Sequence, residues 1–168
     1  MALSLRDARE SPRDALWLRN VLPFYLHELS GFGSEFWWLD ETGRWQPEQA
    51  VETWFTHADV SALVLLSEGR RIGFALVGHS PFPYMSAEAD HVLSEFFILA
   101  AHRRHGLGAE AARLVLHRFP GRWELEVLSL NGPARHFWRK VTQGLPGLQV
   151  APAHGCERFT FTVPPSAP

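Results

Sequence analysis

The chain has 168 residues, of which 46% are hydrophobic, enough for one domain with a core that needs no metal or disulfide. Its formal net charge is −2, so composition gives no electrostatic support for binding nucleic acid. We expect a single domain over residues 1–163 and a frayed, Pro-rich tail at 164–168.

Cysteine use and hydropathy predict the compartment. Cys156 is the only cysteine, so no intramolecular disulfide can form and a cytoplasmic setting is expected. The first residues lack an apolar segment of signal-peptide length, and no apolar run approaches the ~20 residues of a membrane span. We therefore expect no membrane partner.

The first third of the chain predicts one strand and two helices. Leu3 and Leu5 alternate with polar residues, which indicates a short strand. Ser11 is a suitable N-cap for a helix that continues to about residue 29, and Pro23 should kink or divide that helix. Apolar spacing predicts a second, short helix at 47–57.

The segment around this second helix combines aromatic and acidic side chains. Its aromatic residues are Phe32, Phe36, Trp37, Trp38, Trp45, Trp54 and Phe55. Its acidic residues are Glu28, Glu35, Asp40, Glu41, Glu48, Glu52 and Asp59. Two interpretations fit: aromatics in a core or dimer interface beneath a solvated acidic face, or a surface that attracts a cation.

The remaining pattern predicts a sheet with one helical crossover. A hairpin is expected from strands at 62–66 and 72–78, followed by a buried strand at 92–99. A helix separates the 92–99 strand from the next one, at 122–129, so these two should run parallel. A helix capped by Asn131 and an antiparallel pair, 148–151 with 158–163, complete the chain.

The turn from His102 to Ala109 joins the 92–99 strand to its helix. The apolar face of this helix is expected to contain Leu107, Ala111, Leu114 and Val115. Gly106 and Gly108 let a ligand approach the backbone, and the first-turn N–H groups point toward the turn. With Arg103 and Arg104 beside them, these donors suit a phosphate or pyrophosphate.

The spacing of the glycines distinguishes between the known phosphate-binding motifs. Residues 106–111 formally match G-x-G-x-x-G/A, and Glu126 lies near the offset of a ribose acid, as in a dinucleotide-binding oxidoreductase. However, six residues, 100–105, separate the strand from the first glycine, and too few follow Glu126 to build a doubly wound sheet. A Walker Gly-Lys-Ser/Thr sequence is absent.

Two motifs together resemble a known superfamily. Arg103-x-x-Gly106-x-Gly108 resembles the Q/R-x-x-G-x-G/A acyl-CoA signature of the GNAT superfamily of N-acetyltransferases. In that family an apolar strand precedes the signature, as at 96–98, and an Asn-x-x-Ala-x-x-aromatic helix follows the next strand, as at 131–138. The resemblance covers about residues 92–140.

The resemblance implies the fold and the cosubstrate. The fold class is α/β (α+β): a mixed, mostly antiparallel sheet of six to seven strands, with helices on both faces and a splayed central parallel pair. Acetyl-CoA would lie in that gap, with pantetheine on the main chain of Phe96 and Ile98, and pyrophosphate on the amides of residues 103–109. The acyl-CoA site it implies is Phe96, Phe97, Ile98, Arg103, Arg104, His105, Gly106, Leu107, Gly108, Ala109, Asn131 and Phe137.

The implied reaction is acetyl transfer from acetyl-CoA to a primary amine by direct attack in a ternary complex. The Ile98 N–H would stabilise the developing oxyanion. Glu95, a carboxylate in an apolar strand, is the preferred general base, because burial would raise its pKa. Alternatively, Glu95 forms a structural ion pair with an arginine, and Asp90 or a water chain serves as base.

One position departs from the family. Many members have a Tyr that reprotonates the CoA thiolate where this chain has Trp138, and an indole cannot do so. Either solvent or another group supplies the proton, or the chain is a non-catalytic acyl-CoA-binding or sensor domain.

The acceptor and the assembly are less constrained. In the family the first two helices form one wall of the acceptor site, so an acidic, aromatic wall favours a cationic small-molecule or peptidic amine. Dimerisation through the aromatic surfaces or the last strands is open. No metal is expected, because His102 and His105 lack a third ligand.

Overall fold

The computed structural model describes residues 2–34, 39–45, 49–103 and 106–165. Its elements, in chain order, are β1 (Leu3–Asp7), η1 (Ala8–Glu10), α1 (Pro12–Ser30), α2 (Gln49–Thr56), β2 (Val60–Ser67), β3 (Arg70–His79), β4 (His91–Ile98), η2 (Ala100–His102), α3 (Leu107–Arg118), β5 (Gly121–Leu128), α4 (Gly132–Thr142), β6 (Gln149–Ala153) and β7 (Cys156–Val163). No helix in the described part of the chain is long and apolar enough to cross a membrane.

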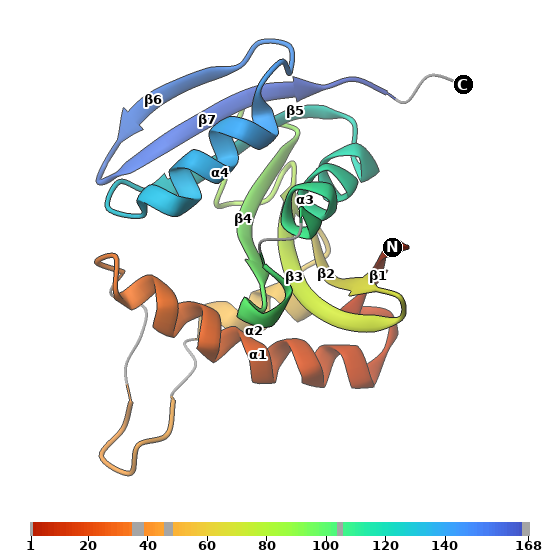
Figure 1. The fold of residues 1–168 in the computed structure, drawn as a ribbon, viewed down its shortest axis with the longest axis vertical. Coiled ribbons are helices and arrows are strands. Elements are labelled where there is room, and N and C mark those ends of the chain that lie inside the picture. Colours follow the sequence, from red (N-terminus) through yellow and green to blue (C-terminus); the bar gives the residue numbers. More distant parts are fainter. Residues whose placement is uncertain (1, 35–38, 46–48, 104–105, 166–168) are drawn as a thin grey trace.

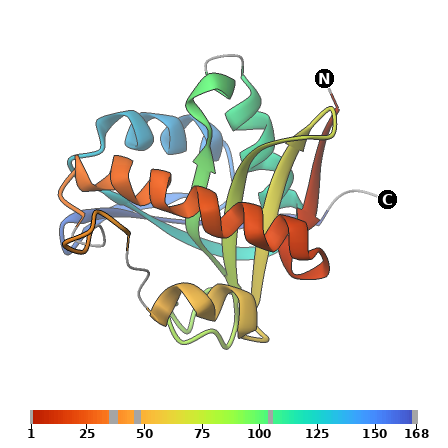
Figure 2. The ribbon, with the colours of Figure 1, turned by 90° about the horizontal axis from the view of Figure 1, so that it is seen from below.

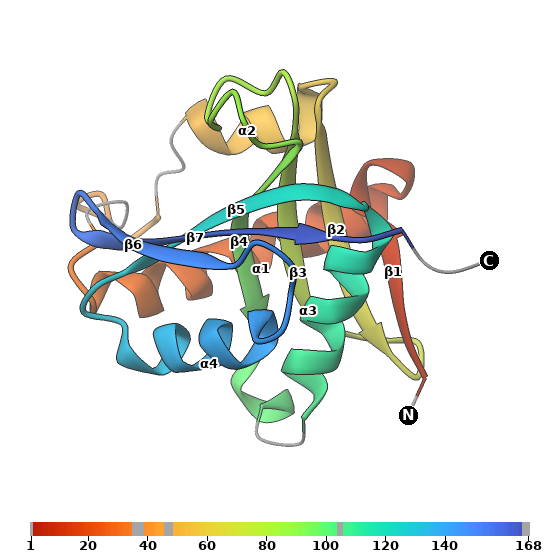
Figure 3. The same cartoon turned by 90° about the horizontal axis from the view of Figure 1, so that it is seen from above.

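The strands form a seven-stranded sheet in the order β1-β2-β3-β4-β5-β7-β6 (Figure 1). Only β4 and β5 pair in parallel, and the other neighbours are antiparallel. α1 lies across one face of the sheet, and α3 and α4 lie on the opposite face (Figures 2 and 3). The fold class predicted from the sequence is therefore confirmed.

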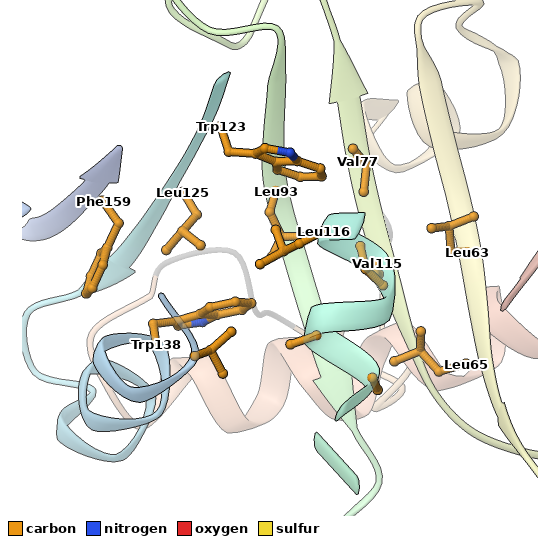
Figure 4. Packing of buried hydrophobic residues seen from close by; sticks show 14 of the residues in the cluster. Leu63, Leu65, Val77, Leu93, Val115, Leu116, Trp123, Leu125, Trp138 and Phe159 are labelled. Carbon is orange, nitrogen blue, oxygen red and sulfur yellow. The ribbon is translucent and has the colours of Figure 1, made fainter. Parts of the chain in front are cut away.

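Each face of the sheet carries its own apolar core. On one face, Leu18, Leu22 and Leu26 of α1 pack with strand residues such as Phe74. On the other, α3 and α4 cover a core that includes Val115, Trp123 and Trp138 (Figure 4). Because both faces are covered, β2 is buried along its whole length.

Two sequence predictions about helices are corrected in part. α1 is one helix from Pro12 to Ser30 and is not divided at Pro23, because Leu22 and Leu26, on either side of the proline, are buried in the same core. In α3, Leu114 is 36% exposed, whereas Ala112 and Leu116 are buried. The buried stripe is shifted because α3 contacts α4 as well as the sheet.

β4 and β5 separate soon after they begin to pair. Their ladder comprises three residue pairs and ends at Leu93 and Leu125, although β4 continues to Ile98. A bulge between β3 and β4 leaves Ser94 without a counterpart on β3. Since bulges increase local twist, this one turns the C-terminal half of β4 away from β5. The predicted splayed parallel pair is therefore present.

A buried carboxylate joins α1 to the edge of the sheet. Asp14 is fully buried and forms ion pairs with Arg6 of β1 and Arg71 of β3. Arg71 Nε donates to Asp14 Oδ1 at 2.6 Å. Burial opposes ionisation, but the hydrogen bonds from Arg71 and Arg6 outweigh it and hold the pKa of Asp14 below its usual value.

Asp14→Asn should lower the free energy of unfolding by about 2–3 kcal/mol, because it leaves two guanidinium groups without their buried counter-charge. Denaturant unfolding measures this loss. Glu52→Gln is the matched control, since its ion pair with Arg19 is at the surface and should contribute less than about 1 kcal/mol. Equal losses for the two variants would contradict a special role for Asp14.

Candidate active site

A cavity of about 900 Å³ lies where β4 and β5 diverge, and it extends to α1. Its polar and aromatic lining residues, among those described, include Tyr25, Trp45, Trp54, Glu95, Phe96, Glu124, Glu126, Asn131, Trp138 and Arg158. The splayed strands therefore create the space that the sequence analysis predicted for a ligand.

Glu95 of β4 lies on the face of the sheet that α1 covers. The hydroxyl of Tyr25, on α1, donates a short hydrogen bond to Glu95 Oε2. Burial raises the pKa of Glu95 to about 7, although the hydrogen bond from Tyr25 acts in the opposite direction. Near neutral pH this carboxyl can both take up and release a proton.

Tyr25 was not identified as a site residue from the sequence. Burial, together with the negative charge of Glu95, raises the pKa of Tyr25 well above its usual value, so the phenol remains a hydrogen-bond donor. The partner of Glu95 is thus a neutral tyrosine and not the arginine considered in the alternative interpretation. The available signal was a single tyrosine on the apolar face of α1, between Leu22 and Leu26.

The edge of β4 that faces β5 is unpaired beyond Leu93. The N–H of Leu99 donates to the carbonyl of Ile72 on β3 at 2.8 Å. Because successive residues of a strand direct their N–H groups to opposite edges, those of Phe96 and Ile98 point away from β3 and into the gap. These are the two residues predicted to contact an acyl-CoA through the main chain.

The aromatic residues of the two motifs divide between the two faces of the sheet. The Phe96 and Phe137 rings stack with centroids 5.8 Å apart, and Trp138 packs edge-on to both. Phe97 lies on the opposite face, in the core beneath α1, with Tyr25 and Phe74. The side chain of Phe97 is therefore part of that core, so a contact between this residue and an acyl-CoA would have to use its main chain.

The N-terminus of α3 retains part of the predicted anion cradle. Gly106 has a φ of +79°, a left-handed conformation that favours glycine. Leu107 and Gly108 are the first two residues of α3, so the helix offers no acceptor for their N–H groups. A Cβ on Gly108 would lie 3.5 Å from the ring of Phe137, which places the cradle beside the aromatic cluster.

Other members of the predicted cradle are already engaged. The Arg103 N–H donates to the Ala100 carbonyl at 3.2 Å, and the Ala109 N–H donates to the Gly106 carbonyl at 3.1 Å. These amides are less suited to a phosphate than predicted, because each already has an acceptor. Arg104 and His105 lie outside the described residues.

The side chain of Arg103 fastens the turn to its surroundings. Its Nε donates to the Ile98 carbonyl at 2.7 Å, and its Nη2 contacts the Glu28 carboxylate of α1 at 2.9 Å. The guanidinium also lies 5.2 Å from the centroid of the Phe97 ring. Arg103 thus connects the end of β4 to α1.

Asn131 has the structural role that its position predicts. Its Oδ1 accepts the N–H of Ala134 at 3.1 Å and so caps α4. It also lines the cavity. Within the described ranges, no group of three or more His, Cys, Asp or Glu side chains could hold a metal ion.

The acidic, aromatic wall is only partly on the cavity. Trp45 and Trp54 line it, but among described residues the acids that line it are strand residues: Glu95, Glu124 and Glu126. Two of the described helix acids form ion pairs instead, Glu52 with Arg19 and Glu28 with Arg103. Phe36, Trp37, Trp38, Glu35 and Glu48 lie outside the described residues.

The sheet excludes the dinucleotide-binding alternative. A doubly wound fold needs a mostly parallel sheet, whereas this sheet has one parallel pair. Glu126, the supposed ribose acid, instead accepts a 2.8 Å hydrogen bond from Arg158. The dinucleotide interpretation is therefore wrong.

Three solved structures with the same fold are acetyltransferases. An acetyltransferase from Thermus thermophilus superposes with a TM-score of 0.68 at 20% identity, covering 97% of this chain and 98% of the other. A GNAT acetyltransferase from Streptococcus agalactiae gives 0.67 at 16% identity, covering 96% and 95%. An aminoglycoside 6′-acetyltransferase type Ii gives 0.64 at 15% identity, covering 99% and 100%.

The family assignment comes from the sequence. No curated protein matches this chain in a sequence search. The sequence model of the acetyltransferase (GNAT) family, however, matches residues 32–142, about two thirds of the chain, and includes both β4 and the start of α3. The chain belongs to the GNAT family of acetyltransferases.

Proposed function

We propose that this protein is an acetyl-CoA-dependent N-acetyltransferase that acts on a cationic primary amine. The observation that carries the proposal is Glu95, a carboxyl with a pKa of about 7 in a cavity beside the unpaired edge of β4. A base with a pKa near the working pH is what deprotonation of an attacking ammonium requires. A chain with one cysteine, and therefore no internal disulfide, also suits the cytoplasm.

The reaction is direct attack without an acyl-enzyme. The amine nitrogen forms a bond to the thioester carbon while Glu95 takes the proton that the amine must lose. The N–H of Ile98 donates to the carbonyl oxygen as negative charge develops on it. The C–S bond then breaks, and the acetyl group is left on nitrogen as an amide.

The leaving thiolate needs a proton, and Trp138 cannot supply one. Its indole N–H can donate a hydrogen bond but is too weak an acid to give up a proton, and the side chain is buried edge-on against Phe96 and Phe137. A thiolate is a good leaving group, so protonation by solvent is sufficient. The non-catalytic sensor alternative rests on this tryptophan, and an assay for free CoA thiol with a panel of amines distinguishes the two.

The acceptor side of the cavity favours cations. Three carboxylates line it, and Arg158, which pairs with Glu126, is the cation among its described lining residues. Trp45 and Trp54 add aromatic surface, which also attracts ammonium groups.

Glu95→Gln should lower kcat about 100-fold or more, because glutamine preserves the shape but cannot accept the proton. The affinity for acetyl-CoA should stay within a factor of about two, since the bound thioester contacts the backbone of β4. Thiol release measures kcat, and calorimetry measures the affinity. Unchanged turnover would remove Glu95 from the mechanism.

The acidic limb of the pH profile of kcat/KM should follow the deprotonation of Glu95. Because the base must be deprotonated, kcat/KM should fall as pH decreases through about 7. Tyr25→Phe removes a hydrogen bond that lowers the pKa of Glu95, so this limb should move to higher pH. A limb that stays in place in Tyr25→Phe would show that another group titrates.

Gly106→Ala should weaken the binding of CoA about tenfold, because it strains the left-handed backbone that begins the anion cradle. Gly69→Ala is the matched control: Gly69 has a φ of +77° and, like Gly106, nothing within 4 Å of an added Cβ. It lies in the β2–β3 turn, outside the cavity. Calorimetry with CoA should show a loss for Gly106→Ala alone, and equal affinities would contradict the cradle.

A further inference from the structure

Glu124 is a buried carboxylate that the mechanism above does not use. It lies on β5 opposite Val92, in the part of the β4–β5 ladder that is still paired, and it is 5% exposed. Its Oε1 accepts the backbone N–H of Ser86 at 2.7 Å. Its Oε2 is buried without a hydrogen-bond partner among the described residues, although the residue lines the cavity.

The other two cavity carboxylates differ from Glu124 in this respect. Glu126 is balanced by Arg158 at 2.7 Å, and Glu95 accepts the hydroxyl of Tyr25. Arg158 also interacts electrostatically with Glu124, but no cation in the described part of the chain forms a hydrogen bond or a close ion pair with it. A buried carboxylate oxygen without a donor is costly, and a cationic guest in the cavity would offset that cost.

We infer that Glu124 binds a second cationic group of the acceptor. This inference rests on the proposed function, in which the reacting amine lies at Glu95. On β3 the partners of Val92 and Glu95 are only two residues apart because of the bulge, and β5 lies one strand spacing to the side, so the backbones of Glu124 and Glu95 are separated by roughly 8 Å. The acceptor class is therefore an amine with a second ammonium or guanidinium group about that far from the reacting nitrogen.

Glu124→Gln tests the charge without disturbing the fold, because glutamine can still accept the Ser86 N–H. The probes are 1,8-diaminooctane and octylamine, which share an alkyl chain and differ in the second ammonium. For wild type, kcat/KM should be higher for the diamine. Glu124→Gln should reduce this preference about tenfold or more, the effect of losing one hydrogen bond to a charged group.

Glu88→Gln is the control for general electrostatics. Glu88 is exposed on the same loop as Ser86 and does not line the cavity, so its loss removes one charge from this region without touching the proposed contact. The diamine preference should persist in this variant. Equal losses in the two variants, or a loss in Glu124→Gln that is the same for both amines, would overturn the inference.

Calorimetry separates the failure of the inference from the failure of the proposed function. Titration of the full chain with 1,8-diaminooctane, without acetyl-CoA, should show binding that Glu124→Gln weakens about tenfold. If this holds but no amine releases thiol, the acceptor site stands and the enzyme proposal fails. If thiol is released and Glu124→Gln changes neither binding nor preference, the enzyme proposal stands and the second cation site is wrong.

Discussion

The separation of β4 from β5 is the constraint on which the site depends. Parallel neighbours normally satisfy each other's backbone groups, and here they stop doing so after Leu93 and Leu125. The bulge at Ser94 turns β4 while β3 still supports its other edge. One irregularity thus opens the cavity and exposes the N–H groups of Phe96 and Ile98, while the rest of the sheet retains regular pairing.

The chemistry of Glu95 arises from two elements that are distant in the sequence. β4 provides the carboxyl, and α1 covers it with apolar side chains and the hydroxyl of Tyr25. Burial alone would raise the pKa further, and the tyrosine limits that rise, so that the value is about 7. The position of α1 is therefore part of the proton chemistry, and Asp14 helps to fix it through Arg6 and Arg71.

The sequence predicted features that depend on neighbouring residues better than those that depend on distant ones. Ser11 and Asn131 cap helices where predicted, because a cap bonds to an N–H three residues away. The pairings of Tyr25 with Glu95, and of Glu28 with Arg103, join residues about 70 positions apart, and no local pattern encodes them. The side chains of Phe96 and Phe97 lie on opposite faces, as strand alternation requires, but the continuous apolar run gave no sign of which face each one occupies.

The proposed site has a cosubstrate half and an acceptor half, and the two place different demands on the sequence. In the proposed function the cosubstrate half uses main-chain N–H groups, which every residue except proline supplies. The sequence therefore shows only the glycines, such as Gly106, that the backbone conformation requires. The proposed acceptor half uses side chains. In the sequence, Glu124 and Glu126 look equivalent, because they alternate with apolar residues in the same strand. Only the structure shows that Glu124 is buried and that Glu126 pairs with Arg158. A sequence motif can therefore indicate the proposed acetyl donor, whereas the class of the proposed acceptor can be inferred only from the folded cavity.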